Sequence, residues 1–177
     1  MRYEQPIALG SPPLTLRPPA PGDEHEVRRA HAVLAAEGFV FALGLSGLSW
    51  RYYLERLAAI EAGDRSHGRV PATFLLAEVG GRLVGRTSIR FELNDELAAT
   101  GGHIGYCVLP EHRGRGHATA ILRRSLAVAL GHGVTSALLT CDRANKPSRR
   151  VIEKCGGVLA DVTGRTCRYW IGGRPSP

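Results

Sequence analysis

The segment that constrains the fold most lies between residues 73 and 91, where two strand-like runs are joined by a two-residue turn. Residues 73–79 (TFLLAEV) and 83–91 (LVGRTSIRF) have the β-branched and aromatic residues typical of strands, and Gly80-Gly81 separates them. Two glycines between such runs predict a tight antiparallel hairpin. A central antiparallel pair argues against an all-parallel, doubly wound sheet.

The residues before this hairpin predict two helices. Residues 1–13 are expected to form a leader, residues 14–17 (LTLR) an edge strand, and PPAPGD a turn. Asp23 is a typical cap for a helix to about Glu37, and Ser49 for a second helix. The loop GFVFALGLSGLS joins them. Residues at helical spacing mark one face of each predicted helix: Val27, Ala30, His31 and Leu34 in the first, and Trp50, Tyr53, Leu54, Leu57 and Ile60 in the second.

The second half of the chain predicts strands that alternate with helices. After the linker NDELAATGG, strands are expected at HIGYCVL, SALLTC, GGVLADV and TCRYWI, and a helix at PSRRVIEKC. Another helix follows RGRG and ends near Gly131 and Gly133, with one apolar stripe of Ala118, Ile121, Leu122, Leu126, Ala129 and Leu130.

The predicted order is therefore β-α-α-β-β-β-α-β-α-β-β. We expect one α/β domain over residues 14–172, with a mixed, mostly antiparallel sheet covered by helices on both faces, and a tail at residues 173–177.

Composition sets limits on location and partners. The chain has 177 residues, no apolar run of 18 residues and no secretory signal, so we expect a cytoplasmic protein without a membrane partner. The net charge of +7 has two readings: a base-composition bias of the host genome, or an anionic ligand. The basic residues are scattered rather than massed on one element, which does not favour a nucleic-acid partner.

The sulfur and imidazole groups show no metal-binding spacing. Cys107, Cys141, Cys155 and Cys167 include no Cys-x-x-Cys pair, and the seven histidines include no His-x-x-x-His pair. We expect reduced, mostly buried thiols and no metal.

The stretch VLPEHRGRGHATAILRR, residues 108–124, predicts an anion-binding loop. The strand ends at Pro110, and the helix begins near Gly116 or His117. The first amides of a helix lack internal partners, and the helix dipole favours an anion at that end. Gly114 and Gly116 would let the backbone approach a ligand, while Arg113 and Arg115 add positive charge.

Two common nucleotide motifs do not fit this loop. A Walker A motif would need Gly-Lys-Ser/Thr, which is absent. The dinucleotide fingerprint matches Gly114 and Gly116 but meets Thr119 at its third position, although Asp142 ends the next strand as a ribose-binding carboxylate would.

The loop resembles the acyl-CoA loop of the GNAT superfamily of N-acetyltransferases. The superfamily pattern Arg/Gln-x-x-Gly-x-Gly/Ala is met by Arg113, Gly116 and Ala118. Asn145-x-x-Ser148 before VIEKCG resembles the second CoA-side helix, and the element order matches from about Leu14. The runs SIRFELNDEL and GGHIGY resemble a bacterial group of predicted acetyltransferases within it.

This resemblance implies a GNAT fold whose sheet splays open at the acetyl-CoA site. It implies that backbone groups of Val108 and Leu109 pair with the pantetheine. Asn145 is expected to order the neighbouring loop and Ser148 to bond to CoA, or both simply cap the helix. The pyrophosphate is expected on loop amides of Arg113, Gly114, Arg115, Gly116, His117, Ala118 and Thr119.

The resemblance also implies direct attack by an amine on the thioester in a ternary complex, with groups that manage protons. His103 is the first candidate for the base and Glu92 the second, with a sheet histidine and a solvated carboxylate or recognition group as alternatives. The tyrosine that is the usual acid is replaced by Ile152, so Tyr106 is the candidate acid unless it is only a core aromatic.

The acceptor is expected to be a small primary amine. Glu92, Asp95 and Glu96 offer negative charge beside a basic site, whereas Trp50 and Tyr53 fit the buried helix face better than a pocket wall. An acyl-CoA-binding GNAT protein without catalysis and a basic nucleic-acid protein are the alternatives. A homodimer through a sheet edge or the strand CRYWI is also expected from the fold.

Overall fold

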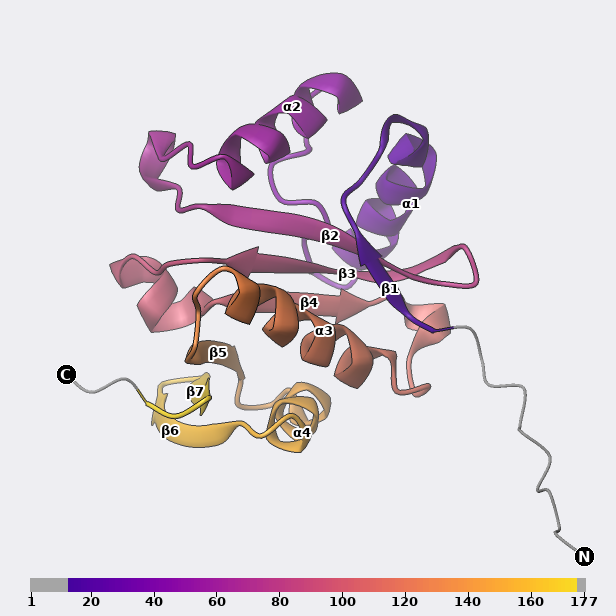
Figure 1. The fold of residues 1–177 in the computed structure, drawn as a ribbon. Coiled ribbons are helices and arrows are strands. Elements are labelled where there is room, and N and C mark those ends of the chain that lie inside the picture. Colours follow the sequence, from indigo (N-terminus) through magenta and orange to yellow (C-terminus); the bar gives the residue numbers. More distant parts are fainter. Residues whose placement is uncertain (1–12, 175–177) are drawn as a thin grey trace, which may run out of the picture.

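The computed structural model describes residues 13–174, so residues 1–12 of the predicted leader and residues 175–177 of the tail lie outside the described residues. The strands and helices follow the predicted order (Figure 1). Their bounds are β1 (Thr15–Arg17), α1 (Glu24–Ala35), α2 (Trp50–Glu61), β2 (Ala72–Val79), β3 (Arg82–Arg90), β4 (Ile104–Val108), α3 (His117–Gly131), β5 (Ala137–Asp142), α4 (Lys146–Lys154), β6 (Val158–Thr163) and β7 (Thr166–Ile171). Four short helical turns lie between them: η1 (Pro21–Asp23), η2 (Ser66–Gly68), η3 (Leu97–Gly101) and η4 (Pro110–His112).

The strands form two antiparallel sheets, in the orders β1-β2-β3-β4 and β5-β7-β6. The hairpin predicted around Gly80-Gly81 pairs β2 with β3, and β4 adds to the other edge of β3. The predicted mixed α/β class with mostly antiparallel strands is confirmed.

The two sheets meet at one point. Within residues 13–174, one backbone hydrogen bond joins the β4 and β5 segments, from the His103 N–H to the Leu138 carbonyl at 2.7 Å. Both strands run on from this bond without further pairing to each other. The edge of β4 that faces away from β3 is therefore free of strand partners beyond His103.

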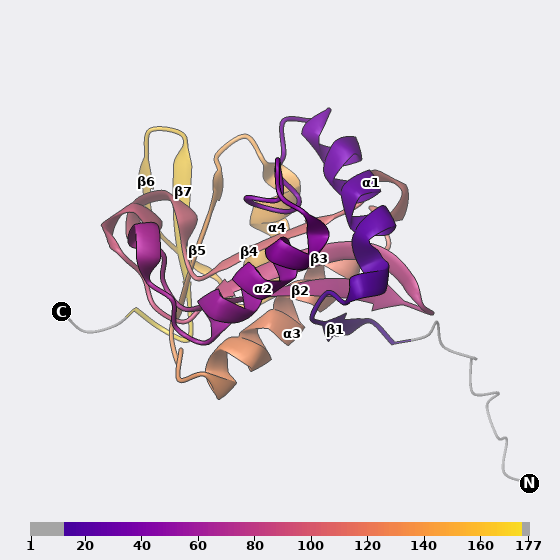
Figure 2. The same cartoon turned by 90° about the horizontal axis from the view of Figure 1, so that it is seen from above.

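Helices cover both faces of the first sheet, and together the views show α1 and α2 on one face and α3 on the other (Figure 2). The α1/α2 face buries Phe41, Trp50, Tyr53 and Phe74, and the α3 face buries Ile89, Leu122 and Leu139, against which Ile152 of α4 packs. Trp50 and Tyr53 are thus core residues, as their spacing indicated.

Several predicted boundaries need correction. Helix α1 ends at Ala35, not Glu37, because Gly38 adopts a φ of 74° and the Phe39 N–H bonds to the Leu34 carbonyl at 2.9 Å, which closes the helix. The linker 94–102 contains the helical turn η3, and the Asn94 side chain accepts the Leu97 N–H at 2.9 Å.

The predicted stripe of α3 is wrong at its end, where Leu130 is 60% exposed. Successive residues are rotated by about 100° around a helix, which turns Leu130 away from its buried neighbour Ala129. Ser125 is buried on the stripe instead, and its hydroxyl donates to Thr87 at 2.9 Å.

A dimer contact through the strand CRYWI would use a face of the sheet, because this strand has no open edge. Strand β7 is paired on both sides, with β5 and with β6. The open edge of this sheet belongs to β6, where Val158, Leu159 and Val162 are exposed.

Candidate functional site

The loop before α3 adopts a conformation that demands glycine. Gly114 has a φ of 76° and Gly116, the N-cap of α3, a φ of 81°. A Cβ atom at either position would meet no atom within 4 Å, so backbone conformation rather than lack of space requires these glycines. The glycine loop is defined here as residues 113–119.

The amides of this loop are available to a ligand. Within residues 13–174, the N–H groups of residues 114–119 donate no hydrogen bond, and the first bond of α3 runs from the Ala120 N–H to the Gly116 carbonyl at 3.1 Å. A run of free amides at a helix N-terminus favours a phosphate both by hydrogen bonding and by the helix dipole.

The two arginines of the glycine loop have different roles. Arg113 forms an ion pair with Glu37 at 2.6 Å and donates to the Val108 carbonyl at 3.3 Å, so it ties the loop to β4 and to the end of α1. Arg115 is exposed. The pKa of His117 is lowered by burial and by the charges of His112 and Arg115, which keeps this side chain neutral at pH 7.

Strand β4 carries Tyr106 toward the start of α4. The Tyr106 hydroxyl lies 3.1 Å from the Ser148 hydroxyl, and the Asn145 side chain caps α4 by accepting the Ser148 N–H at 3.1 Å. Burial raises the pKa of Tyr106 to about 12, so the phenol keeps its proton at neutral pH and can donate it. Three predicted residues thus lie together beside the free edge of β4.

The thiols of Cys141 and Cys155 lie close enough to Tyr106 to contribute to its raised pKa. Burial raises the pKa of both thiols, that of Cys141 to about 11, so they remain protonated and unreactive. All four cysteines are free, and Cys167 is buried while the others are half-buried.

His103 is held where the two sheets meet. Its Nδ1 accepts the Leu138 N–H at 2.9 Å, so the neutral ring carries its proton on Nε2 and has no free lone pair for an amine proton. Burial, followed by the charge of Arg90, lowers its pKa. This geometry favours the alternative role of a sheet histidine.

Glu92 lies just beyond β3 and binds Arg65. Both guanidinium nitrogens of Arg65 bond to this half-buried carboxylate, one of them at 2.9 Å, and this pairing lowers the pKa of Glu92. A paired carboxylate with a lowered pKa is a weak base. Asp95 and Glu96 are exposed residues ahead of η3.

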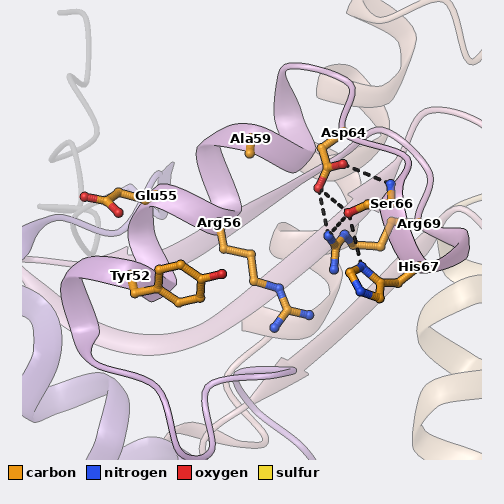
Figure 3. Close-up of a pocket in the computed structure, with 8 residues that line it drawn as sticks. All are labelled: Tyr52, Glu55, Arg56, Ala59, Asp64, Ser66, His67 and Arg69. Carbon is orange, nitrogen blue, oxygen red and sulfur yellow. Dashed lines mark hydrogen bonds and ion pairs between the residues drawn. The ribbon is translucent and has the colours of Figure 1, made fainter.

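A pocket of about 590 Å³ lies elsewhere, between α2 and η2 (Figure 3). It contains none of the predicted site residues. Its polar groups bind one another, since Asp64 pairs with Arg69 at 2.8 Å and also accepts the Ser66 N–H at 2.9 Å. His67, on its rim, has a φ of 59°, which is unusual for a residue other than glycine.

Sequence reasoning missed three polar residues on β3: Arg86, Ser88 and Arg90. They alternate along the strand, which places their side chains on one face, opposite Thr87 and Ile89. The alternation was visible in GRTSIR, but whether any acidic residue neutralises the arginines depends on the fold.

Over residues 13–174 no group of three or more His, Cys, Asp or Glu side chains could hold a metal ion. No helix in the same range has the length and apolar character needed to cross a membrane.

Solved structures with this fold include several acetyltransferases. RimJ from Mycobacterium smegmatis, solved with CoA-disulfide, is 24% identical, with a TM-score of 0.64 over 89% of this chain and 81% of its own. The spermidine N-acetyltransferase from Vibrio cholerae, solved with CoA and spermine, is 20% identical, with a TM-score of 0.60 over 89% of this chain and 94% of its own. The putative acetyltransferase yncA from Salmonella typhimurium, solved with acetyl-CoA, is 17% identical, with a TM-score of 0.61 over 89% and 92%.

No curated protein matches the sequence significantly. The family model of the acetyltransferase (GNAT) family matches residues 43–157, a range that contains the glycine loop, β4, β5 and α4. The match confirms the predicted enzyme class, an acetyl-CoA-dependent acyltransferase. The chain belongs to the acetyltransferase (GNAT) family.

Proposed function

We propose that this protein transfers the acetyl group of acetyl-CoA to a primary amine, and that the glycine loop holds the pyrophosphate of the CoA. One observation carries the proposal: the amides of residues 114–119 have no partner within the described chain and lie next to the unpaired edge of β4. The pyrophosphate would accept these N–H groups, and the pantetheine would pair with the free edge of β4 at Val108 as an added strand, whereas the Leu109 N–H donates to the Val84 carbonyl of β3 at 2.9 Å.

In the proposed reaction the amine nitrogen attacks the thioester carbonyl, the C–S bond breaks, and the thiol leaves as CoA. A backbone N–H on the free edge of β4 would stabilise the negative charge that develops on the carbonyl oxygen. Tyr106 would return a proton to the departing thiolate, because its hydroxyl lies beside Ser148 and is protonated at neutral pH. Tyr106 takes the place of the tyrosine that the superfamily pattern has at Ile152.

The proton of the attacking amine needs a separate route. The Nδ1 atom of His103 is engaged by Leu138, and Glu92 is paired with Arg65. We therefore assign this proton to solvent water, which requires the amine to bind in its neutral form.

The glycine loop is tested by calorimetric titration of acetyl-CoA and CoA into the unsubstituted protein, Gly116→Trp and the control Gly133→Trp. Both glycines have positive φ, 81° and 86°, and open space around them, but Gly133 lies at the opposite end of α3. We expect binding at least ~10-fold weaker in Gly116→Trp and unchanged in Gly133→Trp. Failure of the unsubstituted protein to bind either compound would overturn the proposal.

A GNAT protein that binds acyl-CoA without catalysis is the second candidate, and the isoleucine at position 152 favours it. Ile152 is buried in the core and has no group that could donate a proton. Tight acetyl-CoA binding without release of CoA thiol across a broad set of amines would support this candidate.

A further inference from the structure

The α1/α2 face of β3 carries two arginines that converge on a glycine. In the antiparallel pairing of β3 with β4, Ser88 lies opposite Gly105. A Cβ atom at Gly105 would lie 3.7 Å from the Arg86 Nη1 atom and 3.8 Å from the Arg90 Nη1 atom. Both guanidinium groups therefore lie at van der Waals distance from the position that a side chain on Gly105 would take. These four residues, Arg86, Ser88, Arg90 and Gly105, are called the Gly105 patch.

Arg86 is buried without an acidic partner. It donates to the carbonyls of Phe41 at 2.9 Å, Val40 at 2.9 Å and Gly105 at 3.0 Å, and its guanidinium carbon lies 5.1 Å from the Phe39 ring centroid. These contacts hold the α1–α2 loop against β4. The carbonyl dipoles and the aromatic ring offset part of the free-energy cost of removing this charge from water, but not all of it.

Arg90 is half-buried and still has donors to spare. Within residues 13–174 its side chain donates one hydrogen bond, to the Gly102 carbonyl at 3.1 Å, and forms no ion pair. Most N–H groups of its guanidinium thus remain open to a ligand. Burial lowers the pKa of both arginines, and the charge of Arg86 lowers that of Arg90 further, as expected for neighbouring cations without a counter-ion.

The nearest acidic residue along the strand does not neutralise this charge. Glu92 follows Arg90 by two positions, but its carboxylate binds Arg65. An anion from outside the chain would therefore relieve the repulsion between Arg86 and Arg90 and replace the water lost on burial.

The patch also lies at the place where the acceptor should bind. Gly105 is two residues beyond His103, the point where β4 and β5 part. Tyr106, the next residue, sends its side chain to the opposite face of β4, toward α4. A ligand on the Gly105 patch would therefore meet the proposed thioester from the α1/α2 face, across β4 from Tyr106.

We propose that the Gly105 patch binds a carboxylate of the acceptor, so that the acceptor is a small amine that also carries a carboxylate, as an amino acid does. This rests on the proposed function. Arg90 would donate two N–H groups to the carboxylate oxygens, the Ser88 hydroxyl would donate a third hydrogen bond, and Arg86 would supply fixed charge. The patch would then replace Glu92, Asp95 and Glu96 as the feature that selects the acceptor.

The test compares amines in pairs that differ by one carboxylate: tyrosine with tyramine, ornithine with putrescine, and γ-aminobutyrate with propylamine. Release of CoA thiol gives kcat/KM for each amine at one ionic strength. We expect the unsubstituted protein to prefer the carboxylated member of at least one pair by more than ~10-fold, the loss of one charge-assisted contact being worth about that much.

Three variants assign the preference to Arg90. Arg90→Gln should bring the ratio within a pair to near unity, while Arg90→Lys should keep part of it, because the charge remains without the planar donor pair. The control is Arg82→Gln, which removes an exposed arginine at the start of the same strand and should leave the ratio unchanged. Calorimetric titration of each variant should give an unchanged affinity for acetyl-CoA.

Several outcomes would overturn the inference. A preference of the unsubstituted protein for putrescine, tyramine and propylamine would do so, as would a carboxylate preference that survives in Arg90→Gln. If no amine is turned over, thermal unfolding with CoA plus N-acetylated products gives the same comparison, and equal protection by N-acetyltyrosine and N-acetyltyramine would count against the patch. Failure of the unsubstituted protein to bind acetyl-CoA would instead overturn the proposed function itself.

Discussion

Tyr106 and Ser148 form the one pair of predicted site residues whose side chains bond directly to each other in the described structure. The 3.1 Å contact joins β4 to α4 across the gap between the two sheets. Burial keeps the phenol protonated, so at pH 7 it still carries a proton that a carboxyl group of ordinary pKa would already have lost.

We therefore expect Tyr106→Phe to lower kcat by about 10²-fold or more, the usual contribution of general acid catalysis, with little change in the affinity for acetyl-CoA. The control is Tyr169→Phe, which removes another hydrogen-bonded hydroxyl, one that bonds Arg149 and Glu153. Initial rates and calorimetric titration separate the two effects. Equal kcat values for Tyr106→Phe and the unsubstituted protein would assign Tyr106 to packing alone.

For His103 we predict an effect on the pH dependence of stability rather than on catalysis. Its pKa is lowered by burial in the folded state, so below the ordinary histidine pKa of about 6.5 the unfolded chain binds a proton that the folded chain does not. The free energy of unfolding should therefore fall as the pH drops below about 6.5, by up to about 1.4 kcal/mol per pH unit from this one group.

The measurement is urea unfolding at several pH values between 5 and 8, on the unsubstituted protein and on His103→Asn. The asparagine oxygen can still accept the Leu138 N–H but does not titrate, so the slope with pH should become shallower. His25→Asn, on the exposed surface of α1, is the control and should keep the original slope. A slope unaltered by His103→Asn would contradict the prediction.

The role of single residues was only partly predictable from the sequence. Gly114 and Gly116 could be assigned to an anion-binding loop because arginines, glycines and a helix start adjoin one another in the chain. His103 was placed correctly in the sheet region but its partner, Leu138, lies 35 residues away. Arg86 and Arg90 were missed because an arginine without a counter-ion looks the same in a sequence as an arginine with one.

At the level of elements, the junction of β4 and β5 depends on Gly102. This glycine has a φ of 65°, and a Cβ atom there would lie 2.6 Å from the Leu138 carbonyl oxygen, the acceptor of the bond that joins the sheets. A side chain would both strain the backbone and push the strands apart at their one link.

Gly102→Ala should thus destabilise the protein by roughly 2 kcal/mol or more beyond Gly133→Ala, which has a similar positive φ but nothing within 4 Å. Urea unfolding of both variants measures the difference. Similar losses in the two variants would mean that the junction accommodates a methyl group.

Elements with a clear period were predictable, and those set by tertiary contacts were not. The hairpin, α2 with its Ser49 cap, and the order of all the strands follow from local spacing and turn residues, and the Ser49 hydroxyl does accept the Tyr52 N–H at 3.3 Å. A splay between these strands was expected only through the family resemblance, and the full division into two sheets was not expected, since nothing in HIGYCVL or SALLTC indicates that they meet at one end and part at the other. The position of CRYWI between two other strands likewise depends on long-range strand pairing, which the local sequence does not determine.

For the whole molecule, the net charge of +7 coexists with many ion pairs. Ion pairs engage many of the arginines along the chain: Arg17, Arg28, Arg29, Arg51, Arg65, Arg69, Arg113, Arg165 and Arg168. The expectation that the charge does not serve nucleic acid stays a prediction. The homodimer stays a prediction, either through a sheet edge, such as the open edge of β6, or through the strand CRYWI.

Within residues 13–174 only one backbone hydrogen bond joins β4 to β5, so a ligand that pairs with both strands would add to the contacts between the two sheets. If the pantetheine completes the ladder between β4 and β5, the acetyl donor becomes a part of the folded structure, and the two halves of the chain are held together more firmly when it is present. A ligand that binds only the folded state adds about 2.7 kcal/mol of stability at 100 times its dissociation constant. The lifetime of this protein would then rise and fall with the supply of acetyl-CoA around it, so that the amount of enzyme follows the amount of its substrate without any dedicated regulator.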